Sequence, residues 1–134
     1  MTPDMASMRK ARIVVVVIGV LLPFVARLPG GPDWMGQYLL GGVGLLLFVS
    51  GFNAIAWGAI LACSLAYRRP ASLVLPALFG FAFLAWGHYE VDLMADAQAS
   101  LALVFLPIYA LLPIAIGGAL GYLLDRHLRR AAAA

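Results

Sequence analysis

"GQYLLGGVGLLLFVSGFNAIAWGAILACSLAY", residues Gly36 to Tyr67, contains no charged residue, and this run decides the class of fold. A spanning helix needs about 20 apolar residues, and at about 1.5 Å per residue this run is longer than a hydrocarbon layer of roughly 30 Å requires. We therefore predict a span at residues 40–67, with a tilted axis or with its first turns in the interface. Apolar runs on either side predict three more spans, at about residues 11–28, 72–89 and 99–124.

The composition of the whole chain supports a membrane protein. Of its 134 residues, 64% are hydrophobic and only 11% are charged, and the mean hydropathy is +0.98. Soluble domains carry about 25% charged and about 45–50% apolar residues. The sequence therefore predicts an all-α, integral membrane four-helix bundle, a single domain over residues 1–134 with short basic tails at both ends.

The basic residues indicate a topology rather than a nucleic-acid surface. Eight of the nine Lys and Arg residues flank the ends of apolar runs: Arg9, Lys10, Arg12, Arg68, Arg69, Arg126, Arg129 and Arg130. Because basic residues favour the cytoplasmic side, we predict that both termini are cytoplasmic, and we expect no nucleic-acid partner. Arg27 is then the one basic residue on the outer side, where we expect it to pair with Asp33 or with an acid of the second outer loop.

The first apolar run has a second interpretation. "MRKARIVVVVIGVLLPFVA", Met8 to Ala26, has the basic start and short apolar core of a secretory signal peptide. Its small residues do not follow the A-x-A spacing of a cleavage site, so we expect an uncleaved helix. The single cysteine, Cys63, excludes an intrachain disulfide and a CxxC metal motif, and we interpret it as a small packing residue.

Glycines recur along the predicted spans at helical spacing. Small residues let membrane helices approach closely, so these stripes predict helix contacts, either within the monomer or across a dimer. The expected partner is the lipid bilayer, and the candidate protein partners are a second copy or another membrane protein. The packing glycines are Gly44, Gly51, Gly58, Gly80, Gly87, Gly117 and Gly121.

Few polar residues lie deep in the predicted spans. Asn53 is nine residues from Gly44, which places it on the opposite side of the helix from the glycine stripe. We expect Asn53 to hydrogen-bond another helix or, together with Tyr109 between Pro107 and Pro113, to line a path through the membrane. No acid, lysine or histidine lies at the midpoint of a span, unlike the small multidrug transporters, which keep a carboxylate in their first span.

"HYEVDLMADAQAS", His88 to Ser100, brings three carboxylates, a histidine, a tyrosine and a glutamine together between two apolar runs. A helical segment would align His88, Asp92 and Asp96, whereas an extended one would align His88, Glu90 and Asp92. Either set resembles a metal shell or an acid/base pair, although the spacing matches no defined motif such as HExxH. The alternative is a solvated outer loop in which Asp96 is the N-cap of the fourth helix.

The last apolar run, "DAQASLALVFLPIYALLPIAIGGALGYLL", resembles a segment of small four-helix proteins of the bacterial inner membrane. The resemblance covers roughly residues 86–124 and implies a bacterial envelope location and four helices, but no activity. We therefore expect a structural or accessory protein of the inner membrane without catalytic residues or a cofactor. The alternatives are a small oligomeric channel or transporter, and a membrane-surface metal-binding protein or enzyme that uses residues 88–96.

Overall fold

The computed structural model describes residues 3–133, with side chains from Met5 onward, so Met1, Thr2 and Ala134 of the predicted domain lie outside the described residues. Within this part, four helical segments are long and apolar enough to cross a membrane. They comprise Met5–Leu39, Gly42–Ala66, Pro70–Glu90 and Leu101–Ala133. The predicted all-α, four-helix membrane fold is confirmed.

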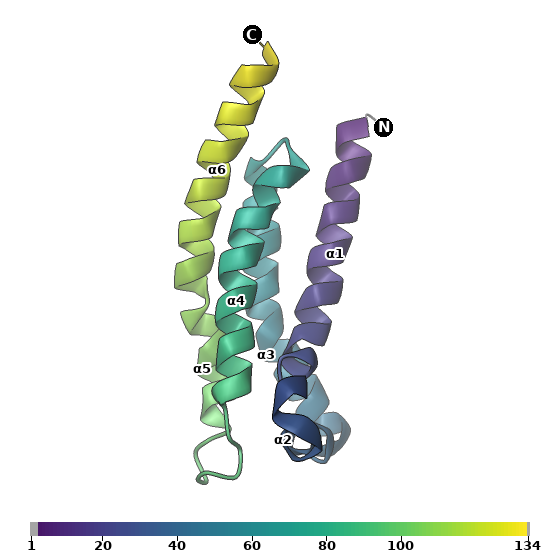
Figure 1. The fold of residues 1–134 in the computed structure, drawn as a ribbon, viewed down its shortest axis with the longest axis vertical. Helices are drawn as coiled ribbons and strands as arrows, with labels where there is room; N and C mark the ends of the chain where they lie inside the picture. The colour runs from purple at the N-terminus through teal and green to yellow at the C-terminus, as the bar shows by residue number, and fades with distance from the viewer. Residues whose placement is uncertain (1–2, 134) are drawn as a thin grey trace.

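Several of these segments consist of more than one helical element (Figure 1). The elements follow in the order α1 (Pro3–Val25), η1 (Leu28–Gly30), α2 (Gly31–Leu39), α3 (Gly42–Cys63), η2 (Ser64–Ala66), η3 (Pro70–Leu73), α4 (Val74–Glu90), α5 (Leu101–Tyr109) and α6 (Leu111–Ala133).

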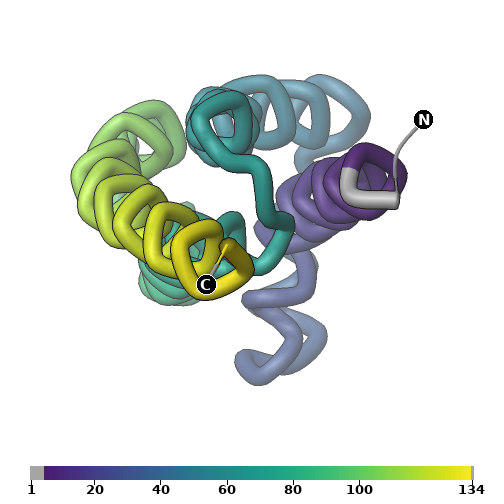
Figure 2. The backbone as a smooth tube through the Cα atoms, turned by 90° about the horizontal axis from the view of Figure 1, so that it is seen from above, coloured from purple at the N-terminus to yellow at the C-terminus, as the bar shows by residue number. Residues whose placement is uncertain are grey.

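The bundle has two distinct ends. Both chain termini lie at one end, here called the terminus end, which also holds the connection at residues 64–73 (Figure 1). The opposite end, here called the loop end, holds α2 and the connection at residues 91–100. Seen from above, the segment that contains α2 projects sideways from the bundle (Figure 2). Helix α4 contacts α1, α3, α5 and α6, and so joins the other spans into one body.

The long apolar run at residues 36–67 is divided between two helices. Helix α2 ends at Leu39 and α3 begins at Gly42, which has φ of 71°. That left-handed conformation carries no steric penalty for glycine, so the chain can turn sharply there. The extra length of the run is therefore used for a short helix at the loop end, and the span itself begins at Gly42.

The fourth span differs from its prediction at its start. Helix α5 begins at Leu101 and its N-cap residue is Ser100, so the prediction that Asp96 is the N-cap is wrong. Asp96 Oδ1 instead accepts a hydrogen bond of 2.7 Å from the Gln98 backbone N–H. This bond closes a local β-turn-like loop in the connection. Helix α5 therefore begins about one helical turn later than an N-cap at Asp96 would predict.

The fourth span is also divided, at Ala110, into α5 and α6. Pro113 lies in the first turn of α6 and has no N–H with which to bond the preceding turn. Its ring also crowds that turn, so a break in the helix just before Pro113 relieves both effects. Pro107 and Pro113 therefore flank a junction between two helices within the fourth span.

Glycines bring several helices into close contact. A Cβ at Gly19 of α1 would lie 2.5 Å from the Trp57 ring of α3, and one at Gly80 of α4 would lie 2.5 Å from Ile114 of α6. Gly117 and Gly121 of α6 lie against the backbone of residues 72–76, and Gly87 lies against Leu106. By contrast, a Cβ at Gly44, Gly51 or Gly58 of α3 would meet no heavy atom of the described residues within 4 Å.

This difference predicts opposite effects of the same substitution. Gly117→Ala would place a methyl group 2.7 Å from the Leu75 carbonyl oxygen and 2.8 Å from Pro76 Cα, both of which are backbone atoms. We expect it to lower the free energy of unfolding by about 1–3 kcal/mol. Gly51→Ala has open space around it and should leave stability unchanged or raise it by about 0.5–1 kcal/mol. Unfolding of both variants in one detergent tests this, and equal losses would contradict the close α4–α6 packing.

Candidate functional site: a buried polar network at the loop end

The loop end contains a buried arginine, Arg27, whose side chain bonds several neighbouring segments. Arg27 follows α1, which ends at Val25, and its side chain is 0% exposed. The chain turns back through η1 and α2 directly after it, and this turn encloses the guanidinium group between α2 and the end of α4. A buried cation is costly unless its donors are satisfied, so the partners of Arg27 determine what this region can do.

The guanidinium donors reach acceptors from three segments. Nε donates to the Trp34 carbonyl at 2.8 Å, and one terminal nitrogen donates to the carbonyls of His88 at 2.8 Å and Val91 at 2.7 Å. The other terminal nitrogen donates to Gln37 Oε1 at 2.8 Å. Arg27 therefore closes the open end of α4, whose last carbonyls have no partner within the helix.

Two aromatic rings of α2 hold the same guanidinium group. Its central carbon lies 4.8 Å from the centre of the Trp34 ring and 4.1 Å from that of the Tyr38 ring. Cations are attracted to ring faces at such distances, and the attraction strengthens away from water. Trp34, Gln37 and Tyr38 occupy positions i, i+3 and i+4, so one face of α2 supplies all three contacts.

A line of hydrogen bonds leads from Tyr38 into the spans. The Tyr38 hydroxyl lies 2.9 Å from His88 Nδ1, and His88 Nε2 lies 3.4 Å from Asn53 Oδ1. The Asn53 amide nitrogen donates to the Gly19 carbonyl at 2.7 Å. Because Asn53 Oδ1 can only accept, the ring proton of His88 fits on Nε2, and Tyr38 then donates to Nδ1. His88 and Asn53 are each 1% exposed, so this line lies inside the protein.

The network also reaches the surface of the loop end. The Gln37 amide nitrogen donates to Asp92 Oδ1 at 2.9 Å, and Gln37 Oε1 accepts from the Leu93 backbone N–H at 3.0 Å. Asp92 further accepts from the Met94 backbone N–H at 3.0 Å. Gln37 therefore connects Arg27 to Asp92 through its side-chain amide. Asp33, the other predicted partner of Arg27, is exposed.

The structure separates the four residues that the sequence suggested as a metal or catalytic set. His88 lies in the last turn of α4 and points into the protein, where it bonds Tyr38. Helix α4 ends at Glu90, and Asp92 lies in the following loop. Glu90 and Asp96 are exposed, and Asp96 bonds within its own turn. Among residues 3–133, no group of three or more His, Cys, Asp or Glu side chains is arranged to hold a metal ion.

The two residues suggested for a membrane path also lie apart. Asn53 is buried and bonds α1, as expected for a residue that joins two helices. Tyr109 is 63% exposed and stacks on Phe105 at 6.1 Å between ring centres, on the surface of the bundle. The sequence interpretation missed Gln37 and Tyr38. The sequence feature that could have indicated them is the spacing of Trp34, Gln37 and Tyr38, which lie about one helical turn apart and shortly after Arg27.

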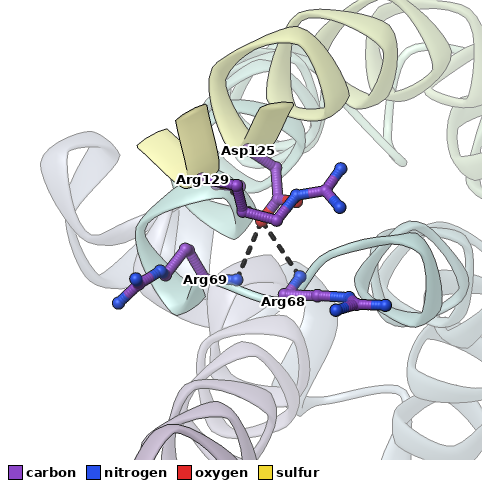
Figure 3. A network of polar contacts seen from close by, with 5 residues as sticks. Arg68, Arg69, Asp125 and Arg129 are labelled. Carbon is purple, nitrogen blue, oxygen red and sulfur yellow. Dashed lines mark hydrogen bonds and ion pairs between the residues drawn. The ribbon is translucent and has the colours of Figure 1, made fainter. Parts of the chain in front are cut away.

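A second buried network lies at the terminus end, around Asp125 of α6 (Figure 3). Asp125 is 0% exposed, and its Oδ1 accepts from the backbone N–H groups of Arg68 at 3.0 Å and Arg69 at 2.8 Å. The Ser72 hydroxyl lies 3.3 Å from the same oxygen, and Arg129 Nε lies 2.9 Å from Oδ2. One carboxylate thus fixes the connection between α3 and α4 onto α6.

Two further contacts hold this connection. Arg12 Nε donates to the Ser64 hydroxyl at 2.8 Å, and the Tyr67 hydroxyl donates to the Gly118 carbonyl at 2.7 Å. Burial, together with the nearby Cys63 and Asp125, raises the pKa of Tyr67 to about 12. The phenol therefore stays protonated and remains a donor at any physiological pH.

Comparison with known proteins finds no matching family model, no matching curated protein and no matching solved structure. The resemblance of the last span to small inner-membrane proteins therefore stays a prediction. The findings identify a multi-pass membrane protein with four spans, whose apolar surface contacts the lipid bilayer.

Proposed function

We propose that this chain is a small structural or accessory protein of the bacterial inner membrane, with both termini in the cytoplasm. In this proposal it binds another transmembrane helix, and the simplest partner is α3 of a second copy. The observation that carries the proposal is the open space at Gly44, Gly51 and Gly58, where an added Cβ would meet nothing within 4 Å in the described residues.

The glycines of α3 differ from the other predicted packing glycines in what they contact. Gly80, Gly87, Gly117 and Gly121 are buried against neighbouring elements, and their small size is used within the chain. A glycine in a helix costs about 0.5–1 kcal/mol relative to alanine. At Gly44, Gly51 and Gly58 of α3, no close packing against the described residues offsets that cost. A second helix packed along the stripe would supply the missing contacts.

The surface around Gly51 has a shape that fits another helix. Leu47, Phe48, Phe52 and Ile55 surround Gly51 and line a shallow hollow of about 220 Å³. The rings of Phe48 and Phe52 lie 4.7 Å apart between centres and form one wall. A two-fold axis through this region would bring the hollow of one copy against the ridge of the other, which is how symmetric dimers form.

The polar networks support a structural role for the rest of the molecule. The donors of Arg27, the carboxylate of Asp125 and the amide of Asn53 all bond groups of the same chain. These contacts join α1, α2, α3 and α4 at the loop end and join α6 to the α3–α4 connection at the terminus end. The bundle thereby presents α3 as a rigid surface.

Self-association in liposomes tests the proposal. We expect energy transfer between labelled copies of the natural protein, and an at least tenfold loss of association in Gly51→Leu. The matched control is Ala115→Leu, which adds the same side chain at an exposed position of α6 and should associate normally. In dilute detergent, neither variant should unfold at a lower temperature, because neither position is packed against the described residues. Absence of transfer in the natural protein, or equal transfer in both variants, would contradict the dimer.

A further inference from the structure

A hollow runs between α1 and α4 on the surface of the bundle. Its part near the terminus end has a volume of about 560 Å³. Its walls are apolar side chains of α1 on one side and of η3 and α4 on the other, including Ala11, Val14, Ile18, Ala77 and Ala82. The alanines account for the hollow, because side chains this small cannot fill the space between the two helix axes.

The hollow continues toward the loop end. A second part of about 310 Å³ is lined by Val17, Leu21 and Val25 of α1 and by Ala85 of α4, and Ile18 lines both parts. From Ala11 to Val25 a helix rises about 21 Å at 1.5 Å per residue. We refer to both parts together as the α1–α4 groove. It is long, narrow and apolar, which suits a single hydrocarbon chain.

Exposed basic side chains lie at only one end of the groove among the described residues, because Arg27, next to the other end, is 0% exposed. Lys10 is exposed and precedes the groove residue Val14 by one helical turn. Pro70 of η3 lines the groove at this same end. The buried acid of this region, Asp125, is paired with Arg129, so it does not oppose an anion nearby.

The α1–α4 groove, we propose, holds one acyl chain of an anionic glycerophospholipid, whose phosphate lies against Lys10. Basic pockets between transmembrane helices bind anionic headgroups, and each basic side chain near the surface contributes about 1 kcal/mol. The apolar groove fits the chain and the adjacent positive charge fits the headgroup. A zwitterionic lipid would gain the contact between its acyl chain and the groove, but it would gain little attraction between its headgroup and the basic side chain. This inference is independent of the proposed contact through α3.

Native mass spectrometry of the purified protein tests the site, with palmitoyl-oleoyl phosphatidylglycerol and palmitoyl-oleoyl phosphatidylcholine added separately. We expect one phosphatidylglycerol retained per chain, in preference to phosphatidylcholine with the same acyl chains. Lys10→Gln should weaken its binding about fivefold, which corresponds to about 1 kcal/mol. Ala82→Leu narrows the groove and should weaken binding tenfold or more. The matched controls are Arg130→Gln at the end of α6 and Ala115→Leu on its surface, and neither lines the groove.

Each contrary outcome would overturn the assignment. Equal retention of both lipids would mean that charge does not select the occupant. Loss in Lys10→Gln with no loss in Ala82→Leu would mean that the headgroup binds without the groove. A crosslink between two copies through a cysteine introduced at residue 82, with Cys63 replaced by alanine, would place a second protein helix in the groove instead of lipid. The energy-transfer measurement on Gly51→Leu reports on α3 and is read separately from these results.

Discussion

Replacing Arg27 by leucine is expected to lower the free energy of unfolding by about 3–5 kcal/mol. Leucine keeps part of the volume but removes every donor, so the carbonyls of Trp34, His88 and Val91 lose their hydrogen bonds in a buried environment. Each buried acceptor left without a donor costs about 1–3 kcal/mol. The loss should show as unfolding at lower denaturant concentration in a fixed detergent.

The conservative variant separates hydrogen-bond geometry from charge. Arg27→Lys keeps the positive charge, but an ammonium group has three donors and no planar fork, so it cannot reach all four acceptors. We expect an intermediate loss of stability. Arg126→Leu, at an exposed position of α6, is the matched control and should change stability little. Stability of Arg27→Leu equal to that of this control would show that the buried network does not stabilise the loop end.

Asp125→Ala is expected to lower the free energy of unfolding by a similar amount, about 3–5 kcal/mol. It leaves the backbone N–H groups of Arg68 and Arg69 without their acceptor and leaves Arg129 without its partner. The effect should be concentrated in the connection between α3 and α4. Amide hydrogen exchange at residues 68 and 69 should therefore accelerate far more than exchange in the middle of α4.

Two milder variants test the same carboxylate. Asp125→Asn keeps an oxygen that can accept from the two backbone groups but loses the attraction to Arg129, so we expect a smaller loss. Ser72→Ala removes one hydrogen bond of 3.3 Å and should cost about 1 kcal/mol. Unchanged amide exchange at residues 68 and 69 in Asp125→Ala would show that other contacts hold the connection.

The sequence predicted the spans and one detail of their packing. Apolar length alone locates the four helices, because hydrocarbon admits few other structures for a single chain. The nine-residue offset from Gly44 predicted that Asn53 faces away from the glycine stripe of α3. In the structure Asn53 is 1% exposed and bonds Gly19, whereas Gly44 lies on the surface. Helix periodicity is sufficient for this inference because it needs no knowledge of neighbouring helices.

The loop-end network could not be predicted in the same way. Arg27 at the end of an apolar run is typical of a side chain that extends to the interface. Its burial depends on α2 folding back over it, and that depends on backbone turns near Gly31 and Gly42, where φ is positive. The predicted third span, at residues 72–89, included His88, but nothing in the sequence shows that His88 faces Tyr38 inside the protein.

The partners of Arg27 also have a consequence for the order of events during synthesis. Trp34 and Gln37 follow Arg27 by 7 and 10 residues, whereas His88 and Val91 follow it by 61 and 64 residues. The first two acceptors emerge from the ribosome almost with the arginine, and the other two only after two more spans have been made. The charge is therefore covered in two stages, first by a local hairpin and later by the arrival of α4. A chain that stops before α4 would leave one terminal nitrogen of this guanidinium group without the two carbonyls that it bonds in the complete bundle.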